Sequence, residues 1–244
     1  MQSSPTILIA IVCGFFLLLL GMVAFAIFFI PKESAGKAKI AQSLGLTPAT
    51  DSQPLLQRVA YVNGISRPEM YRLEHVFQHH HTSGGDVYLF SLHRRDVKAR
   101  TLSQPSGSSK IHYFPLELSA LAFTSPSWQL PRFTAMPRLS GGKLAKIGNK
   151  LSEAATDIKM DVIKFPHIPN LDERYLIATP ETPASQVNPP DGLLRALAAN
   201  PNLRLHAGGD TLTLSYADSN SQTPDEEKMK QLYKIGMQLA RELS

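Results

Sequence analysis

The stretch LRLHAGGDTLTLSY, residues 203–216, decides the class of fold. Its first five and last five residues alternate between apolar and polar side chains, which is the period of a strand with one buried face. The Gly-Gly-Asp sequence at residues 208–210 supplies the small residues that a tight turn needs. We therefore predict a β-hairpin with strands at residues 203–207 and 212–216.

A second hairpin is predicted around the turn sequence Thr-Ser-Gly-Gly-Asp at residues 82–86. The residues that share one face of the strand before this turn are Tyr71, Leu73, His75 and Phe77. The residues that share one face of the following strand, residues 87–93, are Tyr88, Phe90 and Leu92. One or two further strands are predicted at residues 111–124, and short strands at residues 162–165 and 175–179.

Residues 224–243 have the apolar spacing of an amphipathic helix. The sequence Thr223-Pro224-Asp225-Glu226 before it combines a capping box with a proline at the first helical position. The residues that recur on one side are Met229, Leu232, Tyr233, Gly236, Leu239, Ala240 and Leu243. Because a helix of this length is marginal in isolation, we expect that side to pack on a sheet.

Three further helices are predicted, at residues 34–44, 143–158 and 189–200. Gly45 provides the stop for the first, and Asn188 is the expected N-cap of the third. Strands and helices do not alternate regularly along the chain, which argues against a parallel doubly wound sheet. We predict an α+β fold in which an N-terminal transmembrane helix precedes a mostly antiparallel sheet domain, with the C-terminal amphipathic helix packed on the sheet.

The uncharged residues 6–30 predict a membrane anchor, since 22 of these 25 residues are apolar. As a helix the segment spans roughly 37 Å, against a hydrocarbon core of about 30 Å. A cleaved signal peptide has a shorter apolar core that follows positive charge, and no Lys or Arg precedes this segment. We predict an anchor at residues 1–31, a juxtamembrane helix and connector at residues 32–54, and a soluble domain at residues 55–244.

The orientation follows from the basic residues beside the span, because positive charge favours the cytoplasmic side. Lys32, Lys37 and Lys39 follow the span and none precedes it. We predict a single-pass protein of the bacterial inner (plasma) membrane, with its N-terminus outside, its C-terminal domain in the cytoplasm, and lipid contact through residues 6–30.

The whole chain has 244 residues, a net charge of +5 and one cysteine, Cys13. A single cysteine makes no intramolecular disulfide and no cysteine metal site. Its place within the predicted span also excludes a cysteine nucleophile in the soluble domain.

Three blocks of sequence resemble a loose class of uncharacterised bacterial membrane proteins: residues 130–137 (LPRFTAMP), residues 166–177 (PHIPNLDERYLI), and residues 192–214 from Gly-Leu-Leu to Thr-Leu-Thr-Leu. Those proteins have one or two N-terminal membrane helices and a cytoplasmic domain of unknown function. The resemblance implies a bacterial origin and membrane anchoring. It implies no catalytic residues.

The histidines are the first candidates for chemistry, because His75, His79, His80 and His81 are close in sequence. On a strand, His75 and His79 lie about 13 Å apart and do not share an ion. His79 and His81 with His93 remain a possible metal set, and a polar strand end is the alternative. Because phosphate-loop and nucleophile-elbow motifs are also absent from the sequence, we predict no catalytic, cofactor-binding or metal-binding residue and no cofactor.

Basic residues form three clusters that are candidates for contact with lipid or with a partner. They are Lys32, Lys37 and Lys39; Lys143, Lys146 and Lys150; and Lys230, Lys234 and Arg241. Solvated helix faces are the alternative interpretation. Nucleic-acid binding is not predicted, since no aromatic residues interleave with the basic ones.

These features lead to three hypotheses of function. The first is a non-enzymatic accessory or scaffold subunit that docks on another membrane protein. The second is a membrane-surface or ligand-sensing domain, and the third is a hydrolase or metalloenzyme. An enzyme is the less favoured class, because the sequence carries no catalytic signature.

The predicted orientation makes a testable prediction. A reporter that is active only in the cytoplasm should be active when fused after Ser244. Moving Lys32, Lys37 and Lys39 to the N-terminal side of the span should weaken or invert this result. Activity of a periplasm-dependent reporter after Ser244 in the unmodified chain would show that the orientation is wrong.

Overall fold

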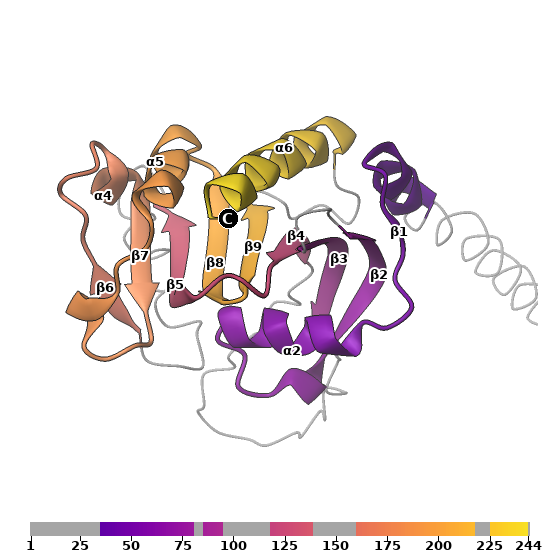
Figure 1. The fold of residues 1–244 in the computed structure, drawn as a ribbon, viewed down its shortest axis with the longest axis horizontal. Helices are drawn as coiled ribbons and strands as arrows, with labels where there is room; N and C mark the ends of the chain where they lie inside the picture. Colours follow the sequence, from indigo (N-terminus) through magenta and orange to yellow (C-terminus); the bar gives the residue numbers. More distant parts are fainter. Residues whose placement is uncertain (1–34, 81–84, 95–117, 139–159, 218–224, 244) are drawn as a thin grey trace, which may run out of the picture.

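The computed structural model describes residues 35–80, 85–94, 118–138, 160–217 and 225–243 (Figure 1). Within these residues, nine strands form one sheet in the order β1-β2-β3-β4-β9-β8-β5-β7-β6, and every neighbouring pair is antiparallel. The strands are β1 Thr47–Pro48, β2 Tyr71–His80, β3 Asp86–Arg94, β4 Leu118–Thr124, β5 Leu130–Pro137, β6 Asp161–Ile163, β7 Tyr175–Thr179, β8 Leu203–Gly209 and β9 Thr211–Tyr216. The predicted α+β class with an antiparallel sheet is confirmed.

Helices cover both faces of this sheet (Figure 1). The α-helices are α2 Gln53–Val62, α4 Leu171–Arg174, α5 Asp191–Ala199 and α6 Glu226–Glu242, with single 3-10 turns at Pro68–Met70 and Ala184–Gln186. Residues 35–43 are also helical. The larger apolar core lies under α5, α6 and residues 35–43, and a smaller core lies between α2 and strands β3 and β4.

The β8–β9 hairpin is present as predicted, and its strands extend further toward the turn. Gly208 pairs with Thr211, so the turn consists of Gly209 and Asp210 alone. Gly209 has a φ of +60°, a conformation that glycine adopts without steric cost. The side chains of Leu203 and Leu205 are fully buried in the larger core.

The β2–β3 hairpin is also confirmed, but the predicted alternation along β2 is wrong. A bulge adds one residue to β2 between Glu74 and Phe77, and His75 lies within it with a φ of +50°. Because side chains alternate between faces, one extra residue reverses every later position. Leu73 therefore packs in the smaller core with α2, whereas Phe77 packs against the larger core.

Helix α6 packs on the sheet through the predicted apolar side. Met229, Leu232 and Leu239 are buried in the larger core. The predicted N-cap is corrected: Asp225 caps the helix, its Oδ1 accepting a hydrogen bond of 2.9 Å from the backbone N–H of Glu227. Asp225 stands directly before the first helical residue, and its carboxylate also suits the positive N-terminal end of the helix dipole.

Helix α5 begins two residues later than predicted. Its N-cap is Pro190, and the predicted side-chain cap from Asn188 is absent there. The carbonyl of Pro190 instead accepts the backbone N–H groups of Leu193 and Leu194. Of the predicted short strands, residues 175–179 match β7, and β6 ends at Ile163 rather than at residue 165.

Strand β5 and helix α2 were not predicted, and neither were the short elements β1 and α4. Strand β5 lies between β8 and β7 in spite of Pro131, because an irregularity in the register falls between Leu130 and Phe133. Helix α2 begins with Pro54 in its first turn and ends where Gly64 adopts a φ of +68°. Pro54 and Gly64 are signals in the sequence that could have indicated where α2 begins and ends.

The helix predicted at residues 34–44 is found at residues 35–43 and ends at Gly45, which has a φ of +72°. The N–H of Leu46 donates to the carbonyl of Ala41 and the N–H of Gly45 to that of Gln42, which is a Schellman motif. Ile40 and Ala41 are buried in the larger core. This helix and the following Leu46 therefore pack on the sheet domain, although both were assigned to the juxtamembrane region.

The predicted anchor at residues 6–30, the predicted strand residues 111–117 and the predicted helix at residues 143–158 lie outside the described residues. In the part of the chain that the structure describes, no helix combines the length and apolar character needed to cross a bilayer.

The packing of α6 makes a second prediction. Leu232→Ala and Leu239→Ala should each lower the free energy of unfolding by about 2–5 kcal/mol, because each truncation leaves a cavity under the helix. Lys234→Ala, on the exposed face of the same helix, should change it by less than about 0.5 kcal/mol. Thermal unfolding of the full chain measures both effects. Leucine variants that melt like the parent protein would show that this side of α6 does not hold the core together.

Candidate functional site

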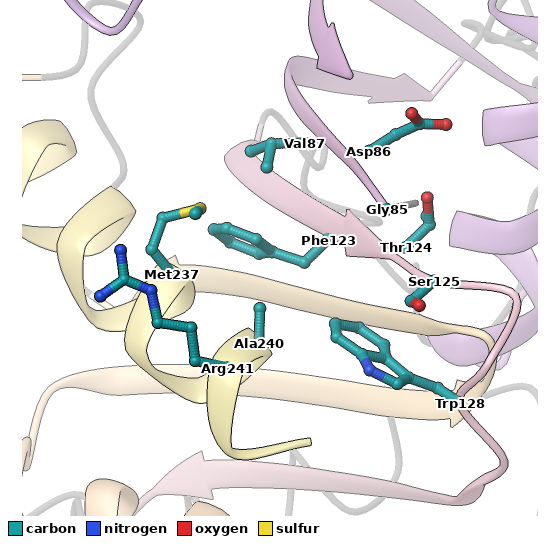
Figure 2. A pocket seen from close by; sticks show the side chains of 10 residues that line it. All are labelled: Gly85, Asp86, Val87, Phe123, Thr124, Ser125, Trp128, Met237, Ala240 and Arg241. Carbon is teal, nitrogen blue, oxygen red and sulfur yellow. The ribbon is translucent and has the colours of Figure 1, made fainter. Parts of the chain in front are cut away.

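A pocket of about 170 Å³ lies between the C-terminal half of α6 and the sheet (Figure 2). Its helix side is formed by Met237, Ala240 and Arg241. Its sheet side is formed by Val87, Phe123 and Trp128, together with residues 85–86 and 124–125. Three segments that are far apart in the sequence therefore build one small, mainly apolar pocket.

The sheet side of the pocket is apolar because two core positions face it. Val87 and Phe123 are direct partners in the β3–β4 ladder, so both side chains point to the α6 face. Trp128 follows β4 through a tight turn in which its backbone N–H donates to the carbonyl of Ser125 at 3.0 Å. The indole Nε1 of Trp128 is buried and makes no hydrogen bond.

Helix α6 comes closest to the Phe123 ring of the pocket at Gly236. A Cβ atom at this position would lie 2.1 Å from Cζ of Phe123, far inside van der Waals contact. Phe123 also meets the ring of Tyr233, with centroids 6.4 Å apart. The missing side chain at residue 236 therefore lets α6 approach the Phe123 ring closely.

Arg241 is the charged residue on the helix side of the pocket (Figure 2). It lies in the last turn of α6 and is exposed, so its guanidinium stays in contact with water. The stem of such a side chain covers apolar surface while its charge remains solvated. The site thus combines an apolar interior with a cation at its edge.

The carboxylate of Asp86 points away from the pocket and contacts two other side chains (Figure 2). Its Oδ1 contacts Nδ1 of His80, and its Oδ2 accepts a hydrogen bond of 3.1 Å from the hydroxyl of Tyr88. Burial, and then the negative charge of Asp86, raise the pKa of Tyr88 to about 12. Tyr88 is therefore a neutral donor at physiological pH.

An ion pair close to this network connects α2 to the sheet. The guanidinium of Arg58 contacts Oδ2 of Asp210 through Nη2 at 2.9 Å and Nε at 3.0 Å. Asp210 is the second turn residue of the β8–β9 hairpin, and its carbonyl accepts the N–H of Ser125. The turn thus links α2 to the segment that carries Trp128.

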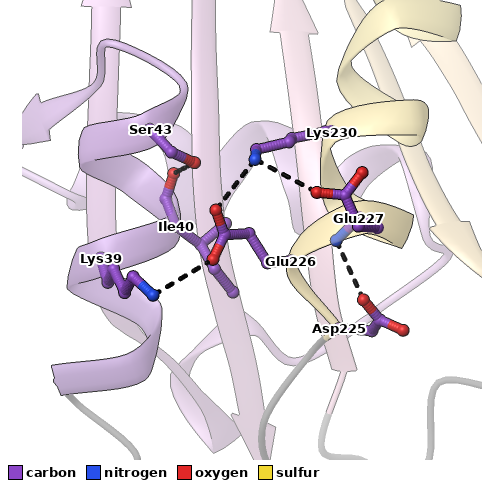
Figure 3. Close-up of polar contacts among 7 residues, drawn as sticks. All are labelled: Lys39, Ile40, Ser43, Asp225, Glu226, Glu227 and Lys230. Carbon is purple, nitrogen blue, oxygen red and sulfur yellow. Dashed lines mark hydrogen bonds and ion pairs between the residues drawn. The ribbon is translucent and has the colours of Figure 1, made fainter.

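The predicted basic clusters are dispersed. Lys37 is only 3% exposed and lies on the buried side of its helix, whereas Lys39 is exposed. Lys39 and Lys230 converge on Glu226, at 3.7 Å and 2.9 Å, and Lys230 also contacts Glu227 (Figure 3). The hydrogen bond from Lys230 is the main cause that lowers the pKa of Glu226.

The other predicted basic residues are found as follows. Lys234 is exposed on α6, and Arg241 lines the pocket. Lys32, Lys143, Lys146 and Lys150 lie outside the described residues. The structure therefore joins members of the first and third clusters through one glutamate, an arrangement that the sequence did not indicate.

The histidines are also separated from one another. His75 lies in the β2 bulge, His80 contacts Asp86, and Nε2 of His93 lies 3.3 Å from the carboxylate of Glu74. His81 lies outside the described residues. Within the described part of the chain, no three His, Cys, Asp or Glu side chains are placed to hold a metal ion.

Comparison of this chain with protein-family models, curated proteins and solved structures gave no match. The resemblance to uncharacterised bacterial membrane proteins stays a prediction.

The contact between Gly236 and Phe123 makes a third prediction. In a solvated helix, Gly→Ala is favourable by about 1 kcal/mol. Gly236→Ala should instead destabilise the protein by about 1–3 kcal/mol, because the new methyl group overpacks against the ring. Gly192→Ala on α5 is the matched control, since its Cβ would meet only the end of the Glu242 side chain. Chemical denaturation of both variants checks the difference, and a Gly236→Ala variant as stable as Gly192→Ala would contradict it.

Proposed function

We propose that this protein is a ligand-sensing domain that binds a small amphiphilic carboxylate in the pocket under α6. The single observation that supports this proposal is the pocket itself, with an apolar interior of Val87, Phe123 and Trp128 and a cation, Arg241, at its edge. Ligand sites in proteins commonly combine an apolar lining with a few polar groups that fix orientation.

The size of the pocket defines the apolar part of the ligand. A cavity of about 150 Å³ that is lined by apolar side chains accepts a benzene ring, and this pocket has about 170 Å³. It therefore suits one ring or a short alkyl chain. Each buried CH₂ contributes about 0.8 kcal/mol, from which the cost of association is subtracted. We expect weak binding, with a Kd on the order of millimolar for a ligand such as octanoate.

The charge at the edge defines the polar part of the ligand. Arg241 is exposed and carries a planar guanidinium, which matches a carboxylate through two parallel hydrogen bonds. An exposed pair of this kind contributes up to about 1 kcal/mol. Arg241 thus selects an anionic ligand over a neutral one of equal length by about fivefold.

Octanoate provides the test, because Trp128 is the only tryptophan in the sequence and lines the pocket. Titration of octanoate into the full chain should change the tryptophan fluorescence with saturation. Ala240→Leu fills the pocket and should abolish the change. Arg241→Gln should weaken binding about fivefold, toward the affinity of 1-octanol.

Lys234→Gln is the control for Arg241, since it removes one positive charge from an exposed position of the same helix. This variant should bind octanoate like the parent protein. Equal fluorescence changes in the parent protein and in Ala240→Leu would contradict the proposal, as would a loss of affinity in Lys234→Gln equal to that in Arg241→Gln.

The predicted anchor would place this ligand-sensing domain at the cytoplasmic face of the membrane. The hypotheses of an accessory subunit and of a hydrolase or metalloenzyme stay predictions.

A further inference from the structure

Arg204 lies on the face of β8 opposite to the α6 pocket. Leu203 and Leu205, its neighbours in the strand, are buried in the larger core, so Arg204 points to the face that α2 partly covers. Its Nε atom is buried and has no hydrogen-bond partner. Within the described residues, no carboxylate forms an ion pair with its guanidinium.

Among the described residues, the polar side chains next to Arg204 on this face of β8, β9 and β5 offer hydrogen-bonding groups and carry no negative charge. Ser215 stands directly opposite Arg204 on β9, and Thr213 stands opposite His206. Thr134 on β5 pairs with His206 in the ladder, and its Oγ1 lies 3.0 Å from Nδ1 of that ring. We call Arg204, His206, Ser215, Thr213 and Thr134 the β8 polar patch.

The charge of this patch comes from Arg204. Burial, and then the charge of Arg204, lower the pKa of His206 to about 3, so the imidazole is neutral at physiological pH. Burial also lowers the pKa of Arg204 itself, although a guanidinium remains protonated in proteins. A partly buried cation without a counter-charge is unfavourable unless something supplies one.

We propose that the β8 polar patch binds a phosphate group, with Arg204 as its principal ligand. A guanidinium presents its donors in a fixed fork that matches two phosphate oxygens. The hydroxyl group of Ser215, next to Arg204 in the ladder, supplies a further donor. This site lies on the opposite face of the sheet from the octanoate pocket and does not depend on it.

The test compares inorganic phosphate with chloride at matched ionic strength, using the full chain in a neutral detergent. Phosphate should raise the Tm of the parent protein by about 3–6 °C. Arg204→Met keeps the length of the side chain and removes the charge. It should lose this shift and should melt above the parent protein in chloride, because an unpaired buried charge is gone.

Direct titration of inorganic phosphate by calorimetry should give an affinity at least about tenfold weaker in Arg204→Met. Arg204→Lys should bind with intermediate affinity, since it keeps the charge without the fork. Arg195→Met, which removes an exposed arginine from α5, is the matched control and should bind like the parent protein.

A second arm distinguishes a lipid headgroup from a free phosphate. The full chain is placed in mixed micelles that carry either phosphatidic acid or phosphatidylcholine. A rise in Tm with phosphatidic acid that depends on Arg204 assigns the site to a headgroup. A response to inorganic phosphate alone assigns it to a soluble phosphate. Both results support the phosphate site. Equal phosphate responses in the parent protein and in Arg204→Met, or no response in the parent, would overturn it.

Discussion

The close approach of α6 to the sheet, made possible by the absence of a side chain at Gly236, is the constraint on which the rest of the structure depends. The Phe123 ring occupies the volume that a Cβ would fill. Because α6 lies so near the strands, Met229, Leu232 and Leu239 reach the larger core. The pocket lies beside this ring, between the C-terminal half of α6 and the sheet.

The two faces of the sheet differ in what they bury. The α6 face receives leucines from both strands of the central hairpin and is continuously apolar there. The α2 face receives the residues between those leucines, and these are Arg204, His206, Thr213 and Ser215. This face becomes apolar at strands β3 and β4, where Leu55, Leu56 and Val59 of α2 pack on it, and α2 also lies close to β8 and β9. The alternation in LRLHAGGDTLTLSY thus separates an apolar layer from a polar one.

Features that depend on residues close in the sequence were predicted, whereas features that depend on residues far apart in the sequence were not. The hairpins and α6 depend on local spacing and turn residues, and they were predicted. The β2 bulge at His75 was not, because an extra residue is visible only against the partner strand. Asp225 and Thr223 are both good capping residues, and the sequence does not decide between them. The pocket joins residues 85–87, 123–128 and 237–241, which are brought together only by the tertiary fold.

Helix α6 lines the pocket and also contacts the helix at residues 35–43, which follows the predicted anchor in the sequence. Residues 35–43 meet the first turn of α6 through Lys39 and Glu226 (Figure 3), and the pocket lies at the opposite end. An exposed ion pair contributes about 0–1 kcal/mol and does not hold two helices in register. Burial of Ile40 in the core contributes about 1.5–3 kcal/mol and is not screened by salt. Apolar packing, rather than the basic residues, therefore fixes the helix at residues 35–43 against the sheet domain.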